Sequence, residues 1–241
     1  MSGRKLGVLG GLGPLASVEF LRTVYERSAG RPEQEMPHVV LVSDPATPDR
    51  TTELLKDPLS PVLLAAFEQG LMSLLRLDVD EIVVCCVTIH ALLPAVQPEL
   101  RSRVVSLIDI AVDEAMRSPE RHLLVGTIGT SRLRIFESHP DWPRISDRVV
   151  LPEARDAERI HDWIYRLKAG DDPRTIATAL EVFCADLGVG GVIAACTEMH
   201  LVSRCLESLP GRISVIDPLH LAATRWAAAT SARPPRPFLE T

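Results

Sequence analysis

The sequence predicts an α/β protein built on parallel β-sheets. Short runs rich in Val, Ile and Leu alternate with longer segments whose apolar residues recur at helical spacing, a pattern typical of βα units. The runs are apolar throughout, which indicates strands that are covered on both faces. A chain of 241 residues is long enough for one or two domains with buried cores.

The individual elements follow from these two patterns. In chain order, the apolar runs predict strands at residues 5–9, 39–43, 81–86, 104–108, 122–126, 148–151, 191–196 and 213–216. The segments with helical periodicity predict helices at residues 15–29, 59–75, 157–168 and 175–187.

Two internal repeats divide the chain into similar halves. Residues 6–13 are echoed by residues 123–130, and residues 81–90 are echoed by residues 191–200. The second echo places Cys86 and Cys196 at the same junction between a strand and the next helix. Open parallel sheets bind ligands at the carboxyl ends of their strands, so a cleft between the halves would let the two thiols face each other.

We assign one subdomain to residues 1–115, with residues 211–241 returning to it, and the other to residues 116–210.

The composition excludes several classes of protein. The net charge is −6, whereas a nucleic-acid binder is expected to carry an excess of basic residues. No stretch approaches the roughly 18 apolar residues that a membrane span needs, and no signal peptide is evident. The five cysteines form no Cys-x-x-Cys pair. We therefore expect a cytoplasmic protein with reduced thiols.

A glycine-rich turn follows the first predicted strand. Gly11, Gly13 and the residues after them fit the GxGxxG/A fingerprint of dinucleotide-binding proteins. However, the acidic residue expected about 20 positions later is misplaced, since Asp44 lies too far along. A tight structural turn is a second interpretation. We prefer a third, in which backbone N–H groups at a helix start marked by Pro14 hold a carboxylate.

A proline-stiffened loop at residues 44–51 presents Arg50. The planar fork of an arginine can donate two parallel hydrogen bonds to a carboxylate, and a rigid loop would fix that fork in space. The loop therefore predicts a carboxylate-binding function for Arg50.

The cysteines differ in their expected roles. Most buried cysteines are inert small hydrophobes, an interpretation that fits the cysteines at positions 85, 184 and 205. The matched positions of Cys86 and Cys196, with Thr88 and Thr197 beside them, indicate function instead. We expect helix N-termini to lower the pKa of both thiols.

Zinc binding is an alternative use of the same cysteines. Together with His90 and His200, each four positions after its cysteine, they would supply a Cys2His2 set. The short paired spacings usual in zinc motifs are not reproduced.

Four motifs resemble those of the cofactor-independent, two-cysteine aspartate/glutamate racemase superfamily, and within it the aspartate racemase branch. They are Gly10-Gly11-Leu12-Gly13-Pro14, Pro48-Asp49-Arg50-Thr51, Cys86-Val87-Thr88-Ile89-His90 and Cys196-Thr197-Glu198. Residues 164–170, which include Lys168, and residues 216–218 are similar to further family segments.

This resemblance implies two flavodoxin-like subdomains related by a pseudo-twofold axis, with an active site between them. It also implies a homodimer that acts on a small carboxylate substrate without pyridoxal phosphate or metal. Racemisation needs a base on one face of the α-carbon and an acid on the other, and Cys86 and Cys196 would take these roles on opposite faces. The substrate-binding residues would be Gly13, Arg50, Val87, Thr88, Thr130, Lys168, Thr197 and Glu198.

Two departures from the family pattern bear on the substrate. Val87 stands where the family has an asparagine, and valine can neither donate nor accept a hydrogen bond. Residues 133–136 read Leu-Arg-Ile-Phe where the branch tends to have Ser-Gly-Ile-Tyr, which predicts a bulkier and more basic pocket wall.

These departures keep an alternative open, namely a relative that uses the cysteines for another carbanion or enol reaction. Such a relative could be an isomerase, decarboxylase, epimerase or cyclase acting on a different carboxylic acid. A non-catalytic binding protein is a further alternative.

Overall fold

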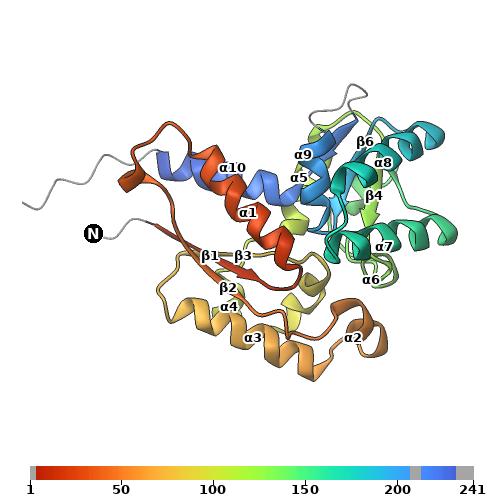
Figure 1. The fold of residues 1–241 in the computed structure, drawn as a ribbon. Coiled ribbons are helices and arrows are strands. Elements are labelled where there is room, and N and C mark those ends of the chain that lie inside the picture. Colours follow the sequence, from red (N-terminus) through yellow and green to blue (C-terminus); the bar gives the residue numbers. More distant parts are fainter. Residues whose placement is uncertain (1–3, 207–212, 232–241) are drawn as a thin grey trace, which may run out of the picture.

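A computed structural model describes residues 4–206 and 213–231 of the chain. Over these residues the chain forms two parallel sheets, one with the strand order β2-β1-β3 and the other with the order β5-β4-β6-β7 (Figure 1). The strands are β1 (Lys5–Gly10), β2 (His38–Ser43), β3 (Glu81–Val84), β4 (His122–Gly126), β5 (Val149–Val150), β6 (Gly191–Ala195) and β7 (Ser214–Ile216).

Helices surround both sheets. The α-helices are α1 (Pro14–Arg27), α2 (Arg50–Lys56), α3 (Pro61–Leu75), α4 (Pro98–Arg101), α5 (Leu107–Arg117), α6 (Ile128–Arg132), α7 (Ala154–Lys168), α8 (Pro173–Leu187), α9 (Met199–Leu206) and α10 (Pro218–Ser231). Three short 3-10 helices are η1 (Glu33–Glu35), η2 (Thr88–Ala95) and η3 (Trp142–Arg144).

The two sheets repeat one arrangement of strands, which confirms the predicted fold class. β1 lies between β2 and β3, and β4 lies between β5 and β6, with every pairing parallel. The repeated sequence segments form strands at equivalent positions of the two sheets: β1 corresponds to β4, and β3 corresponds to β6. Strand ends that are equivalent by sequence are therefore equivalent in space.

The expected strand at residues 104–108 is wrong. Only Val104 makes an isolated parallel bridge, to Ile82, and the rest of the run begins α5. The Ser106 hydroxyl accepts a hydrogen bond from the backbone N–H of Asp109 and so caps this helix. The apolar residues thus belong to the buried face of an amphipathic helix rather than to a strand.

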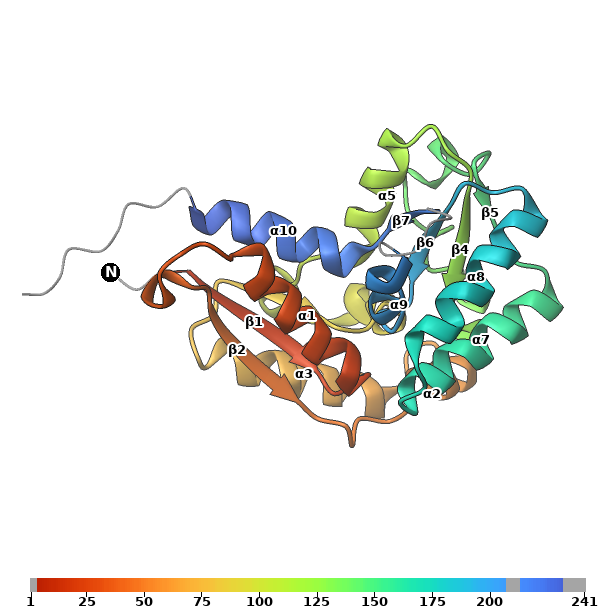
Figure 2. The same cartoon turned by 45° about the horizontal axis from the view of Figure 1, so that its top comes forward.

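A shared hydrophobic core joins the two sheets. It includes Leu6 of β1, Leu124 of β4 and Trp226 of α10, all buried. Two further cores each lie within one half. α10 runs beside α1, although the two helices come from opposite ends of the chain, as Figures 1 and 2 both show.

The segment predicted to return to the first subdomain is described from residue 213 to residue 231. β7 pairs with β6 in the second sheet, whereas α10 packs against α1 and α5. The subdomain boundaries at 115 and 210 stay predictions. Across the described ranges no helix has the length and apolar character needed to span a bilayer.

Candidate active site

Both cysteines lie just past the carboxyl ends of equivalent strands. β3 ends two residues before Cys86, and Cys196 directly follows β6. Both are almost completely buried, with 6% and 5% of their surface exposed. The Thr197 hydroxyl donates a hydrogen bond of 3.1 Å to the carbonyl oxygen of Cys85. This bond crosses between the halves and holds the two cysteine-bearing turns together.

Glu198 lies against the second cysteine. The Cys196 thiol donates a hydrogen bond of 2.9 Å to Glu198 Oε2. The other carboxylate oxygen, Oε1, is buried and has no hydrogen-bond partner, and only 2% of the residue is exposed. A buried carboxylate oxygen without a partner is costly, so this atom marks a place where a ligand's donor would be stabilising.

The glycine turn brings the start of α1 against this carboxylate. Gly11 has a φ of +82°, and a Cβ there would lie 2.3 Å from the backbone nitrogen of Asp44, so only glycine fits. A Cβ on Gly13 would lie 1.9 Å from Glu198 Oε1. Since α1 begins at Pro14, the Glu198 carboxyl group lies against the N-terminal end of this helix.

We predict that Gly13→Ala lowers activity by about tenfold or more, because the added methyl group displaces the Glu198 carboxylate; displacements of about 1 Å can cost even more. The control is Gly190→Ala, since a Cβ there meets Glu120 at an ordinary 3.6 Å. Steady-state kinetics of both variants, with circular dichroism as a check on folding, measure the effect. Equal activity of the Gly13→Ala variant and the unmodified protein would contradict the prediction.

Arg50 is fixed by backbone carbonyls of the first half. Its Nη2 donates to the carbonyl oxygen of Leu12, and its Nη1 donates to those of Thr47 and Pro48. Its Nε is buried without a partner and so remains available to a ligand.

Charges across the site act on the pKa of Arg50. Burial acts to lower this pKa, but the negative charges of Cys86, Asp49 and Glu198 together raise it above its ordinary value. The guanidinium therefore stays charged beside the first cysteine.

Lys168 supplies a second positive charge from the other half. It is the last residue of α7, and its ammonium lies 4.2 Å from the centre of the Tyr165 ring. Burial lowers its pKa, but Cys196 first and then Glu198 raise it, so the net shift is upward. The Tyr165 hydroxyl donates to Asp49 Oδ2 at 2.8 Å, which links α7 to the start of α2.

Threonine hydroxyls form a chain at the strand ends. Thr127 Oγ1 lies 3.3 Å from the hydroxyls of Thr51 and Thr88 and 3.2 Å from that of Thr130. The Thr130 hydroxyl in turn donates to the carbonyl oxygen of Ala195. The structure thus brings the predicted residues Thr88 and Thr130 into one network. The central member, Thr127, was not among the predicted site residues.

The expectation that helix N-termini lower the thiol pKa is wrong for Cys196. Its pKa is raised well above the ordinary value because of burial first and the Glu198 carboxylate second, while Lys168 opposes the shift. Glu198 is in direct hydrogen-bond contact with this thiol, whereas α9 begins three residues further on, at Met199.

The predicted pocket wall is only partly as expected. Val87 is 1% exposed and belongs to the shared core, together with the fully buried Phe136. Arg134 adopts a left-handed conformation with a φ of +51°, and its side chain is exposed to solvent. The added basic charge therefore points away from the buried site. Leu133 packs against both the shared core and the core of the first half.

The histidines of the zinc alternative are engaged elsewhere. His90 Nδ1 lies 2.8 Å from the carbonyl oxygen of Cys86, and its Nε2 accepts a hydrogen bond from the backbone N–H of Leu107. Within residues 4–206 and 213–231, no three His, Cys, Asp or Glu side chains are placed to hold a metal ion.

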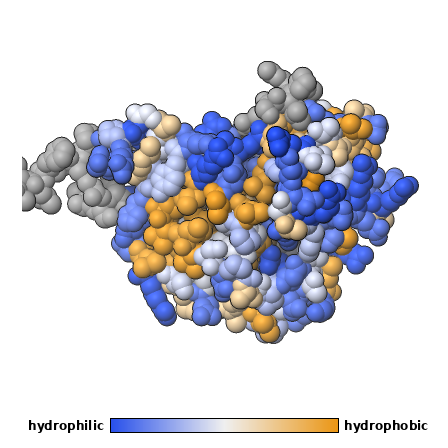
Figure 3. Space-filling view, in the orientation of Figure 1, coloured by the Kyte–Doolittle hydropathy of each residue, from blue (hydrophilic) through white to orange (hydrophobic). Residues whose placement is uncertain are grey.

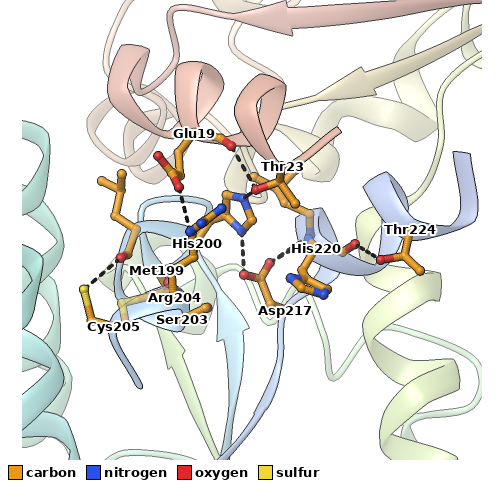
Figure 4. Close-up of polar contacts among 12 residues, drawn as sticks. Glu19, Thr23, Met199, His200, Ser203, Arg204, Cys205, Asp217, His220 and Thr224 are labelled. Carbon is orange, nitrogen blue, oxygen red and sulfur yellow. Dashed lines mark hydrogen bonds and ion pairs between the residues drawn. The ribbon is translucent and has the colours of Figure 1, made fainter. Parts of the chain in front are cut away.

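His200 is the centre of a buried polar cluster (Figure 4). Its Nδ1 lies 2.7 Å from Asp217 Oδ2, and its Nε2 lies 2.9 Å from Thr23 Oγ1. Arg204 pairs with Glu19 nearby, at 3.0 Å. The cluster ties α9, which follows the second cysteine turn, to α1 and to the turn after β7.

A small cavity of about 120 Å³ lies beside the site in the first half. It is lined by residues of β1, β2 and α3, including Leu9 and Phe67, and by Leu12 and Thr47. The last two also hold Arg50 through their carbonyl oxygens. The cavity adjoins the arginine loop, and neither candidate catalytic cysteine lines it.

Known proteins share this fold. The Asp/Glu/Hydantoin racemase family matches the chain over residues 9–226. The aspartate racemase of Picrophilus torridus is 24% identical with a TM-score of 0.75, covering 94% of this chain and 95% of that one. An aspartate racemase homologue from Pyrococcus horikoshii OT3 is 21% identical with a TM-score of 0.67, and the coverages are 95% and 99%. Glutamate racemase from Francisella tularensis subsp. tularensis SCHU S4, solved with D-glutamate, is 16% identical with a TM-score of 0.59, and the coverages are 95% and 81%.

The two-sheet fold, with its strand ends meeting between the halves, is the fold of racemases, which are isomerases. The chain belongs to the Asp/Glu/Hydantoin racemase family, since the family match extends over nearly its whole length.

Proposed function

We propose that this protein is a cofactor-independent racemase of aspartate or a related acidic amino acid, in which Cys86 and Cys196 act on opposite faces of the α-carbon. One observation carries the proposal. Two buried thiols lie at equivalent strand ends, where the hydrogen bond from Thr197 to Cys85 joins their turns and the Cys196 thiol donates to Glu198. Arg50 and Lys168 bring positive charge to the same site.

The charges of the site support an acidic amino acid as substrate. Arg50 and Lys168 offer two positive charges to two carboxylates, and arginine suits carboxylates because of its forked geometry. The unpartnered Oε1 of Glu198 suits the substrate's ammonium group, which only donates hydrogen bonds. In this arrangement the hydroxyls of Thr88, Thr130 and Thr197 add hydrogen bonds, while Gly13 leaves room and Val87 forms an apolar wall.

The chemistry follows from these positions. A thiolate on one face takes the α-proton, and a thiol on the other face returns one. The electron pair left on the α-carbon spreads into the adjacent carboxylate, where fixed positive charge stabilises it. Arg50 and Lys168 supply that charge from opposite halves. Because both are preorganised and the site is buried, the stabilisation is stronger than it would be in water.

Proton NMR in D2O tests the proposal directly. Enzyme incubated with L- or D-aspartate should replace the α-hydrogen by deuterium, so the α-signal disappears while the β-protons remain. Glutamate and a panel of other carboxylic acids serve as comparisons. If the folded protein causes no exchange in any amino acid, the proposal is rejected.

Val87 favours a second candidate, a carbanion or enol reaction on a different carboxylic acid. Valine can neither donate nor accept a hydrogen bond, so Val87 offers no partner to the polar substrate group that the family's asparagine would hold. Exchange with a carboxylic acid of the panel that lacks an α-amino group, and none with amino acids, would favour this candidate.

We also propose that the protein acts as a homodimer. An apolar surface extends over β2 and between α1 and α3 (Figure 3); residues 39–42 of the edge strand β2 are only partly buried, and Leu15 and Val18 of α1 are exposed. Apolar patches beside an open sheet edge are typical association surfaces, and a second copy would cover this one.

Val18→Glu is therefore expected to convert a dimer to a monomer, because it buries an unpaired charge in the interface. Val182→Glu is the matched control, since Val18 and Val182 are 59% and 58% exposed and Val182 lies on α8. Size-exclusion chromatography with light scattering measures the mass. A dimer that survives Val18→Glu would place the interface elsewhere.

A reducing compartment is part of the proposal. We propose that the five cysteines, which are free thiols, stay reduced because the protein works in the cytoplasm.

A further inference from the structure

The two cysteines are equivalent in sequence but not in their surroundings. The Cys196 thiol donates a hydrogen bond of 2.9 Å to the Glu198 carboxylate, and both residues are buried. Cys86 instead interacts with the guanidinium of Arg50. One sulfur therefore meets an anion and the other meets a cation.

Charged groups reach Cys196 from several elements. Glu198 lies in the same turn, Lys168 approaches from α7, and Cys86 approaches from the turn after β3. Lys168 favours a thiolate at this position, but it acts on Glu198 and Cys86 as well. Only Glu198 accepts the thiol's hydrogen bond. A thiolate formed at Cys196 would lose this bond and would stand beside a carboxylate in a site with little water.

We propose that Glu198 keeps Cys196 protonated in the resting enzyme, so that Cys196 begins as the acid and Cys86 as the base. Glu198 then has two roles: Oε1 is proposed to contact the substrate's ammonium group, and Oε2 acts through the second cysteine as a positioning group. This inference rests on the proposed racemase function for its catalytic consequence. The protonation state of the Cys196 thiol, however, can be tested without any substrate.

The proton balance of a turnover follows. The Cys86 thiolate takes the α-proton, so the C–H bond breaks, an S–H bond forms and the electron pair stays on the substrate. That pair then takes the proton of Cys196 on the opposite face, which breaks its S–H bond and forms the new C–H bond. Cys196 is left as a thiolate beside Glu198. After product release it regains a proton from water while Cys86 gives one up to water.

Alkylation of the thiols measures the first half of the proposal. Iodoacetamide labelling of Cys196 as a function of pH, followed by peptide mass spectrometry in a Cys86→Ala background, gives the pH at which this sulfur becomes reactive. Glu198→Gln should move that onset down by about one pH unit or more, since neighbouring charges shift a pKa by this order. Glu181→Gln is the control: its Oε1 is likewise buried without a partner, but it lies on α8.

An unchanged onset in the Glu198→Gln variant would overturn the proposal. If that variant does not fold, Glu198→Met, which is neutral and similar in length, carries the same expectation. Glu198→Asp keeps a carboxylate and should retain part of the high onset, which a purely structural effect of substitution would not predict.

The second half concerns the choice of base. Elimination of chloride from 3-chloroaspartate needs only one proton abstraction. The rate of chloride release from each enantiomer therefore reports on one cysteine. The Cys86→Ser and Cys196→Ser variants show which cysteine acts on which enantiomer. We expect the enantiomer that uses Cys86 to release chloride at least about tenfold faster, the ratio that corresponds to one pKa unit. Glu198→Gln should reduce this ratio toward one, and Glu181→Gln should leave it unchanged.

Equal elimination from both enantiomers by the unmodified enzyme would overturn the inference but not the proposed function. If neither elimination nor deuterium exchange is observed, the proposed function is rejected. The pH at which alkylation begins would still decide whether Glu198 keeps Cys196 protonated.

Discussion

Replacing Cys86 or Cys196 by serine is expected to lower the rate of racemisation by about 10²–10⁴-fold, the contribution typical of a positioned acid or base. A serine hydroxyl has almost the size of the thiol but loses its proton far less readily. Each variant lacks one of the two proton-transfer groups, so inversion of the α-carbon becomes slow in both directions. Optical rotation or circular dichroism of the amino acid measures the rate in both directions.

The serine variants should also differ in a specific way. In D2O each is expected to retain slow α-hydrogen exchange with the one enantiomer whose proton faces the remaining cysteine. Cys184→Ser is the control, because Cys184 is a buried free thiol in the core of the second half. Racemisation by either site variant at the rate of the unmodified enzyme would exclude a mechanism with two cysteines.

Asp217→Asn is expected to destabilise the protein by about 3–5 kcal/mol, the usual cost of removing one partner of a buried ion pair. Asp217 and His200 lie 2.7 Å apart and are both buried. Urea unfolding measures the loss, and a double-mutant cycle with His200→Gln isolates the coupling between the two side chains. The pair of His139 and Asp109, 3.3 Å apart and with an exposed carboxylate, is the control and should show far weaker coupling.

The pH dependence of this pair has a definite sign. Burial acts to raise the pKa of Asp217, but His200 and other hydrogen bonds lower it from 3.8 to about 2. Its contribution of about 2 kcal/mol is present above pH 4 and is lost as the pH falls toward 2. Burial acts to lower the pKa of His200, but Asp217 raises it above 6.5, so its contribution is present below that pH and is lost at higher pH. Coupling that does not weaken at either extreme would contradict this account.

Much of the fold could be predicted because it depends on local periodicity. β1 and β4 are apolar runs that end at glycine-bearing turns, and their equivalence was visible as a sequence echo. The error at residues 104–108 has a local cause too. An apolar run cannot by itself distinguish a strand from the buried face of a helix, and the cap at Ser106 decides the outcome.

The site was less predictable where tertiary contacts decide the chemistry. The positions of Cys86 and Cys196 followed from the repeat, but the direction of the Cys196 pKa depends on how Glu198 folds back onto the sulfur. Thr127 was missed because a threonine after a strand carries no distinctive signal. Its role as the cap of α6, where it accepts a hydrogen bond from the backbone of Thr130, is the one local clue.

If the two thiols act as proposed, their burial also controls when substrate and water can reach them. Water and a carboxylate reach sulfurs that are so enclosed only when the covering residues move apart. Any separation of α7 from α2 breaks the bond between Tyr165 and Asp49. While the site stays shut, a hydrogen taken from the substrate does not mix with the solvent. The lifetime of the shut state thus determines how many inversions one molecule undergoes before it leaves.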